Sequence, residues 1–404
     1  MRAGMTLGGL VVTALFVGGC RPPVAAPEAA RGVAVRFRPG ATPPPEVARL
    51  LERVPNASYD EGLQRAVELL LAAARAPSSR ISPEASADAL TAAAYPGFAK
   101  FSREYNGGAF PEDLADALAN AALERDQPVD LALARRNFSD GTSLWIAGFA
   151  HRPLLLDPLP RDLAPDELLP VRVEATVKLP PLTLFVAPPD GPVRVMPLSK
   201  DEALWVDGFH LPGETRLEVV SDAGGDAQVL LLWSALVDTD AAPPESLPLA
   251  SAQSLDPIAA AESLYAALTA LRAQAGLPPL TRFPAFEPLA REHAATLAAR
   301  GQVAHVLPGQ SPGVATLARA RFHPQAKHLE DIAAAFSWRE AQDLVELSPG
   351  HRRNLLCETC THMSVGVALE PTLDAVPRLF VVWELLSFPN GEPTPIPDYD
   401  RSLP

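Results

Sequence analysis

Three side chains in the last third of the sequence could do chemistry together: His305, Glu330 and His351. Two histidines and a carboxylate form a ligand set that suits zinc or another divalent ion. The same set also suits acid–base catalysis, because histidine exchanges a proton near neutral pH. The three residues lie on separate segments, so only folding can bring them together. Two hypotheses follow: a shared polar site, or scattered histidines that cap helices or lie at the surface.

His351 belongs to the stretch SPGHRRNLL at residues 348–356. Serine followed by proline is a typical helix start, since Ser348 can cap the first free N–H groups and Pro349 fits the first helical position. Gly350 leaves the backbone bare beside His351. We therefore expect the imidazole to face whatever lies across from it.

The elements that would position these residues are predicted from residue 255 onward. Apolar residues at helical spacing predict a helix after Asp256 and a second one over about 284–300. Ser337 and Glu340 fit a capping box, which predicts a third helix. Two strand-like runs at 364–369 and 379–386 then predict a β-hairpin.

Six short segments carry a family resemblance by their order. They are LRAQAGLPPL (271–280), AREHA (290–294), GQVAH (301–305), LEDIA (329–333), SPGHRRNLL (348–356) and VGV (365–367). Together they resemble the bacterial branch of the CAP superfamily, also called the SCP domain, over residues 255–388.

This resemblance implies an α-β-α sandwich with a polar cluster in a cleft. The family's cluster includes a histidine at the position of His305, a glutamate at Glu330 and a histidine that matches His351, and it holds a divalent metal in some members. The resemblance implies no single reaction, because family members have been linked to lipid or sterol binding, signalling and proteolysis.

The sequence departs from the family pattern near its polar residues. Leu329 stands where the family has a glycine before the glutamate, and the tryptophan expected before SPGH is replaced near Val345. Glu346 is the candidate for a second cluster glutamate found in eukaryotic members. An incomplete cluster of this kind favours binding over catalysis.

Cys357 and Cys360 form a CETC motif directly after the SPGHRRNLL stretch. An exported protein meets an oxidising compartment, so a local disulfide is one interpretation. A metal site with His351 and His362 nearby is a second, and redox chemistry is a third.

The N-terminus predicts export. Arg2 precedes an apolar run at 7–16, which is shorter than the roughly 20 residues of a membrane-spanning helix but suits a signal peptide. The small residues before Cys20 resemble the lipobox of bacterial lipoproteins. This resemblance implies cleavage after residue 19 and acyl chains, such as palmitate, on Cys20. The alternative is an ordinary secretory signal followed by an unrelated cysteine.

The chain as a whole is predicted to be α+β. After the signal peptide (1–19) we expect a lipidated cysteine and tether (20–45), a mainly helical region with a β-hairpin (46–151), an all-β sandwich (152–240), a linker (241–254), the CAP-like α-β-α sandwich (255–388) and a tail (389–404). The order of elements in 46–151 parallels that of the CAP-like region. We therefore predict a degenerate copy without the polar site, because no histidine precedes His151.

Composition narrows the function. A formal net charge of -14 excludes a nucleic-acid partner, which would need a basic stripe. There is no serine elbow motif and no HExxH motif. The leading prediction is a lipid-anchored protein of the bacterial cell envelope, periplasmic or on the outer membrane or cell surface, that binds a small or lipid-like ligand or an envelope partner without a cofactor.

The competing prediction is a metal-assisted, protease-like hydrolase that uses His305, Glu330 and His351 with a divalent metal such as zinc. A structural or adhesive module is a third interpretation.

Overall fold

The computed structural model describes residues 33–40, 42–54, 56–123, 127–199, 202–222, 227–247, 255–307, 327–371 and 377–388. The fold is of mixed α+β class, as predicted. Within these ranges, none of the helices combines the length and the hydropathy that a bilayer crossing requires. The signal peptide, Cys20 and the tail at 389–404 lie outside the described residues.

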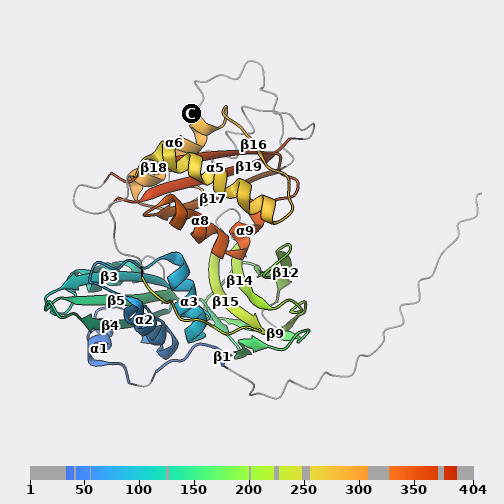
Figure 1. The fold of residues 1–404 in the computed structure, drawn as a ribbon. Helices are drawn as coiled ribbons and strands as arrows, with labels where there is room; N and C mark the ends of the chain where they lie inside the picture. The colour runs from blue at the N-terminus through green and yellow to red at the C-terminus, as the bar shows by residue number, and fades with distance from the viewer. Residues whose placement is uncertain are drawn as a thin grey trace, which may run out of the picture. The chain divides into compact units, whose positions relative to one another are not determined.

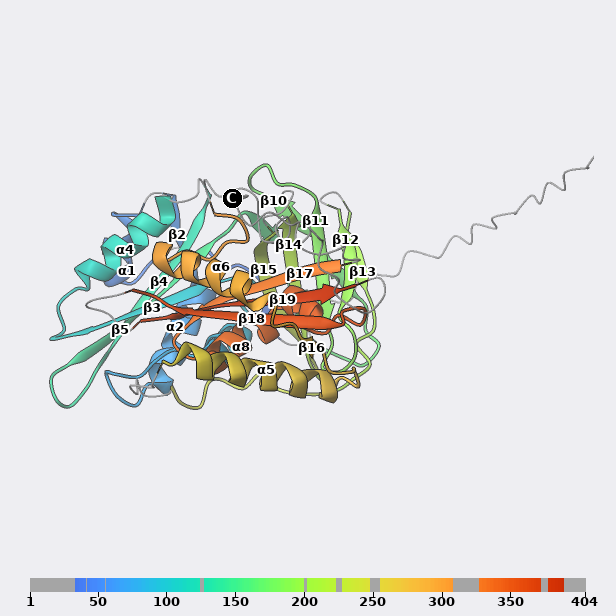
Figure 2. The same cartoon turned by 90° about the horizontal axis from the view of Figure 1, so that it is seen from above.

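The C-terminal module is an α-β-α sandwich, which confirms the predicted fold. A four-stranded sheet, in the order β16-β18-β19-β17, has α6 on one face and α5, α8 and α9 on the other (Figures 1 and 2). Strand β19 pairs antiparallel with β17 and β18, whereas β16 runs parallel to β18. The elements are α5 (Pro257–Gln274), β16 (Thr281–Arg282), α6 (Glu287–Arg300), β17 (Lys327–Ala335), α8 (Trp338–Leu347), α9 (Pro349–Leu355), β18 (His362–Leu369) and β19 (Leu379–Ser387).

The helix starts in this module follow the predicted caps. The side chain of Asp256 accepts a hydrogen bond from the backbone of Ile258, and that of Ser337 accepts one from Glu340. Ser348 caps α9 in the same way, so SPGHRRNLL begins a short helix of its own. Helix α6 ends at Gly301, in the left-handed conformation that favours glycine.

A close approach of two backbones holds α6 against the sheet. A β-carbon added to Gly366 in β18 would lie 2.1 Å from the carbonyl carbon of Ala290 in α6. Only glycine leaves room for this contact. Gly366 therefore sets how closely α6 packs on the face of the sheet that carries the polar residues.

The first module contains more strand than the sequence predicted. The hairpin of β4 and β5 is confirmed, but it lies inside a four-stranded sheet in the order β2-β4-β5-β3. The sequence did not reveal β2, which has three residues, or β3, whose side chains are all exposed or half-buried and so show no apolar alternation. The elements are α1 (Pro45–Leu51), β2 (Ala57–Tyr59), α2 (Glu61–Ala73), α3 (Pro83–Ala93), β3 (Lys100–Asn106), α4 (Glu112–Leu123), β4 (Val129–Asn137) and β5 (Ser143–His151).

The two four-stranded sheets share one topology. In each, the first strand in sequence is parallel to the third, the third is antiparallel to the fourth, and the fourth is antiparallel to the second. In the first module, too, helices pack on both faces of the sheet. Identical strand connections support the predicted degenerate copy, which stays a prediction.

A buried carboxylate gives the first module a testable pH dependence. Asp130 is fully buried and accepts hydrogen bonds from the hydroxyls of Tyr95, at 2.9 Å, and Ser58, at 3.1 Å, with Arg152 at 3.3 Å. Burial raises the pKa of Asp130 from 3.8 to about 6, although Arg152 lowers it. The folded state keeps the Asp130 proton up to a higher pH than the unfolded state does. Asp130's contribution to stability therefore falls as the pH rises from about 4 to about 6.

We expect Asp130→Asn to remove this slope, which for one group is at most about 1.4 kcal/mol per pH unit. Urea unfolding of the two proteins across this range measures the difference. The exposed Asp157, changed to Asn, should leave the slope as it is in wild type. Parallel wild-type and D130N profiles would refute the assignment.

Residues 152–240 form the predicted β-sandwich around a single apolar core. Its main sheet has the order β12-β11-β14-β15-β8, and its pairs are antiparallel except that β8 runs parallel to β15. The strands are β6 (Leu154–Leu156), β7 (Leu159–Pro160), β8 (Asp162–Leu163), β9 (Leu169–Val171), β10 (Val173–Ala175), β11 (Leu182–Ala187), β12 (Arg194–Leu198), β13 (Leu204–Val206), β14 (Gly213–Asp222) and β15 (Ala227–Val237).

The predicted tether at 20–45 is wrong at its C-terminal end. Residues Ala34–Val35 form β1, which pairs with β7, and Val35 is 1% exposed within the core of the sandwich. The prolines of this segment hid a short apolar alternation of Val33, Val35 and Phe37. The chain thus enters the fold at least ten residues before the predicted boundary at Glu46.

Candidate functional site

Two of the three predicted site residues meet directly. His305 follows α6, and its Nδ1 lies 2.7 Å from Glu330 Oε1 on β17. The Glu330 side chain is 11% exposed and the His305 side chain 32% exposed. Glu330 therefore lies on the covered face of the sheet, and its partner His305 reaches the surface.

Strand alternation places Glu330 on the α6 face of the sheet. Glu330 pairs in register with Glu384 of β19, which pairs in turn with Ser364 of β18, so their side chains share one face. The neighbouring position, Asp331, points to the opposite face. One strand thus supplies carboxylates to both layers.

Glu384 extends the polar row into the core. Its Oε2 lies 2.6 Å from His328 Nε2, and the Glu384 carboxyl is fully buried. Burial raises the pKa of Glu384 well above its ordinary value, and the negative charge of Glu330 raises it further. Burial and the neighbouring charge of Glu330 therefore both favour the protonated form of Glu384.

His293, on the helix α6 that packs on this face of the sheet, completes the row. It is 5% exposed, and its Nε2 lies 3.6 Å from Glu330 Oε2. Burial lowers the pKa of His293, against the raising effect of Glu330. The result is a polar row of His328, Glu384, Glu330, His293 and His305, of which His305 is the most exposed member.

His351, the third predicted residue, makes its hydrogen bonds elsewhere. Its Nδ1 lies 2.7 Å from Ser348 Oγ, within α9. Burial, with a smaller contribution from the charge of His305, lowers the pKa of His351 to about 4. His351 is therefore neutral near pH 7.

Asp331 and Asn354 fix α9 on the other face of the sheet. Asn354 Nδ2 donates to Asp331 Oδ1 at 2.8 Å, and burial raises the pKa of this fully buried carboxyl to about 8. Glu346, the candidate for a second cluster glutamate, instead accepts a hydrogen bond from Gln342. It takes no part in the polar row.

The predicted metal ligands form hydrogen bonds with their neighbours. Within the described ranges, no three histidine, cysteine, aspartate or glutamate side chains are grouped so that they could hold a metal ion. His305 Nδ1 and Glu330 Oε1 share a short, charge-assisted hydrogen bond. We derive no step through a metal.

Cys357 and Cys360 form a disulfide, with their Cα atoms 5.4 Å apart. Their sulfur atoms are then unavailable as thiolate ligands. The buried Arg272 of α5 donates to the carbonyls of Leu355 and Cys357. The disulfide thus closes the end of α9, which Arg272 ties to the helical layer.

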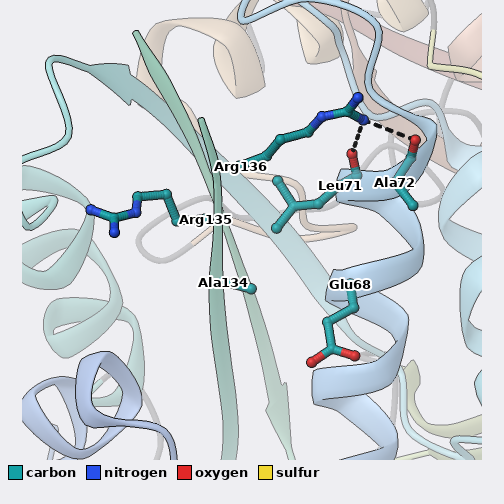
Figure 3. A pocket seen from close by; sticks show the side chains of 6 residues that line it. All are labelled: Glu68, Leu71, Ala72, Ala134, Arg135 and Arg136. Atoms are coloured by element: carbon teal, nitrogen blue, oxygen red, sulfur yellow. Dashed lines mark hydrogen bonds between the residues drawn. The ribbon is translucent and has the colours of Figure 1, made fainter. Parts of the chain in front are cut away.

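A surface hollow of about 580 Å³ lies in the first module, between α2 and β4 (Figure 3). Arg136 extends over it but donates to the carbonyls of Leu71 and Ala72, while Arg135 turns the other way. The guanidinium group of Arg136 is therefore bound to carbonyls at the end of α2. The hollow therefore offers little to an anionic ligand.

The sequence missed His293, His328 and Glu384, although His293 and Glu384 each left a signal. His293 continues the buried stripe of Leu289 and Leu297 on α6, and a histidine on such a stripe needs a partner. Glu384 interrupts the otherwise apolar run of β19. A charged residue is almost never fully buried unless it is paired, so this position marks a polar contact.

A family comparison agrees with this geometry. The model of the CAP family, described as the cysteine-rich secretory protein family, matches residues 265–383. No curated protein sequence matched the chain.

Three solved structures are similar at low identity. An outer surface protein of Borrelia burgdorferi is 21% identical, with 33% of this chain and 97% of that chain covered and a TM-score of 0.28. An extracellular protein containing an SCP domain from Bacillus anthracis is 15% identical, with coverage of 44% and 65% and a TM-score of 0.28. A cysteine-rich secretory protein of Staphylococcus aureus is 12% identical, with coverage of 58% and 84% and a TM-score of 0.27.

The match of the family model covers α6, β17, α8 and α9. It therefore includes His351 and every residue of the polar row except Glu384, which lies one residue past its end. Residues 265–383 are therefore a CAP domain.

Proposed function

We propose that this protein is anchored in the bacterial cell envelope by lipid on Cys20, and that its CAP domain binds a small amphipathic, lipid-like ligand. The observation that carries the binding site is the position of His305. Its partly exposed imidazole ends the buried polar row, and Val303 and Val306, 52% and 45% exposed, flank His305 in the chain. Apolar residues beside a polar pair suit a ligand with an apolar body and a polar head.

The chemistry of the polar row supports binding over catalysis. Glu330 is engaged by two histidines, with Oε1 2.7 Å from His305 Nδ1 and Oε2 3.6 Å from His293 Nε2, which supports a structural role for this carboxylate over that of a general base. Ser348, the hydroxyl beside His351, is buried and caps a helix.

A fluorescent fatty acid tests the binding site. We expect the full chain in detergent to bind cis-parinaric acid saturably, and His305→Gln or Val306→Ser to raise the Kd about tenfold, which corresponds to roughly 1.4 kcal/mol. Val195→Ser in β12, a valine of similar exposure at 42%, is the matched control and should bind as wild type does. Absence of saturable binding, or equal Kd values for all four proteins, would rule out this site.

The hydrolase remains the second candidate, because His305 and Glu330 do lie together. Metal analysis of the full chain separates the two functions. One equivalent of a divalent ion in wild type, lost in both His305→Ala and His351→Ala, would replace the binding proposal with the metal-assisted one. Equally low metal content in all three proteins would remove the metal-assisted route.

A further inference from the structure

A carboxylate from the β-sandwich reaches the SPGH segment of the CAP domain. Glu218 lies on β14 and is fully buried. Its Oε1 lies 2.7 Å from Ser348 Oγ, and its Oε2 accepts a hydrogen bond from the backbone N–H of Gly350 at 2.6 Å. Both oxygens of the carboxylate are therefore used at the start of α9.

Gly350 makes this approach sterically feasible. A β-carbon at this position would lie 2.9 Å from Glu218 Oε2. The sequence suggested that Gly350 bares the backbone for the imidazole of His351. The structure corrects this interpretation, because the group that occupies the space beside Gly350 is the Glu218 carboxylate.

Ser348 links Glu218 to His351. When Glu218 is ionised, only one assignment of donors and acceptors satisfies the hydrogen bonds of the Ser348 hydroxyl. A hydroxyl has one hydrogen to donate and two lone pairs that accept. The hydrogen goes to Glu218, because a carboxylate only accepts. The two lone pairs then accept from the backbone N–H of His351, at 3.4 Å, and from its Nδ1–H, at 2.7 Å.

We propose that Glu218 is a positioning residue for the CAP domain: acting through Ser348, it holds His351 in the tautomer that carries its proton on Nδ1. The second ring nitrogen, Nε2, then presents a lone pair and acts as an acceptor or base. A neutral histidine takes the tautomer that the hydrogen bond of its other nitrogen dictates. The β-sandwich thereby sets the chemical character of a residue in a different module.

The proposal goes beyond ligand binding at His305 and does not depend on it. The contacts from Glu218 to His351 involve neither the polar row nor Val303 and Val306. The tautomer is measured without any ligand. A failure of fatty-acid binding would leave this inference standing, and the reverse also holds.

The decisive variant is Glu218→Gln. Its amide oxygen must face the N–H of Gly350, because the opposite orientation would set two donors against each other. The amide nitrogen then donates to Ser348 Oγ, and the hydroxyl hydrogen turns to His351 Nδ1. The imidazole must accept there, so its proton moves to Nε2.

Nitrogen NMR of the full chain, labelled with ¹⁵N-histidine, reads the tautomer directly. The spectra are recorded at about pH 8.5, above the pKa of Glu218, which burial raises to about 7. We expect the Nδ1–H form in wild type and the Nε2–H form in Glu218→Gln, with the His351 signal assigned from His351→Gln. Glu214→Gln, the same change on the same strand, is the matched control and should keep the wild-type form.

Two results would overturn the proposal: an Nε2–H imidazole in wild type, or an unchanged Nδ1–H imidazole in Glu218→Gln. If Glu218→Gln fails to fold, Ser348→Ala serves as the second variant, since it removes the link but keeps Glu218. It should also lose the Nδ1–H preference. If Ser348→Ala keeps the Nδ1–H preference, the proposal that Glu218 acts on His351 through Ser348 is also overturned.

Discussion

Replacing Gly366 with alanine is expected to destabilise the CAP domain by at least about 3 kcal/mol, the upper part of the range for overpacked cores. The added β-carbon would overlap the carbonyl carbon of Ala290 at 2.1 Å and its oxygen at 2.2 Å. Both are backbone atoms of α6, so no side chain can rotate away to relieve the clash. Helix α6 would have to leave the sheet, taking His293 from its contact with Glu330.

Urea unfolding followed by circular dichroism measures this loss. Gly107→Ala is the matched control, because a β-carbon there has no atom within 4 Å, and its unfolding midpoint should stay close to that of wild type. A midpoint for Gly366→Ala equal to that of the control would show that α6 does not approach β18 as closely as described. The same variant should also bind the fluorescent fatty acid poorly, since the polar row depends on α6.

Replacing Cys20 with serine is expected to abolish acylation completely. A serine side chain has no thiol for lipid attachment, so the chain should incorporate no radiolabelled palmitate when expressed in a bacterial host. Each buried methylene contributes about 0.8 kcal/mol, and several acyl chains anchor a protein where one chain binds only reversibly. The wild-type chain should therefore sediment with membranes and require detergent for release.

The palmitate label is the deciding measurement for Cys20→Ser. An uncleaved precursor could remain in the membrane through its apolar run at 7–16, so sedimentation alone does not separate the two proteins. A double change of Cys357 and Cys360 to serine controls for the loss of cysteine and should keep the label. An unlabelled wild-type chain would establish the ordinary secretory signal and remove the lipid anchor from the proposed function.

Local sequence determined the helices and caps of the CAP domain. Asp256, Ser337 and Ser348 each carry a side-chain oxygen that can satisfy an N–H group two or three residues ahead, and each caps a helix. These contacts depend on neighbours in the chain, and short-range chemistry settles them. For the same reason the hairpin of β18 and β19 was predictable from its apolar runs.

Strands held by distant partners were harder to predict. Strand β17 carries the motif of Glu330, yet its residues do not alternate cleanly, so the sequence predicts no strand there. Strands β1, β2 and β3 were missed because they are short or lie with one face open, so their pairing comes from other segments. Pairing between distant strands is a tertiary interaction, and a local window of sequence does not contain it.

For the predicted site, too, the sequence indicated which residues matter, and the fold decided what they contact. Residue types and family order predicted a site at His305, Glu330 and His351, and the first two side chains meet at 2.7 Å. What each residue touches was decided by the fold: the register of β17 against β19 sets Glu330 beside Glu384, and α6 brings in His293.

The SPGHRRNLL stretch shows the division most clearly. By itself the sequence determined that Ser348 caps a short helix and that Pro349 and Gly350 begin it, because these are properties of adjacent residues. Only the tertiary structure brings Glu218 there, from 130 positions away, against Ser348. A buried carboxylate is stable only where hydrogen-bond donors meet it, and in this fold the start of α9 supplies those donors.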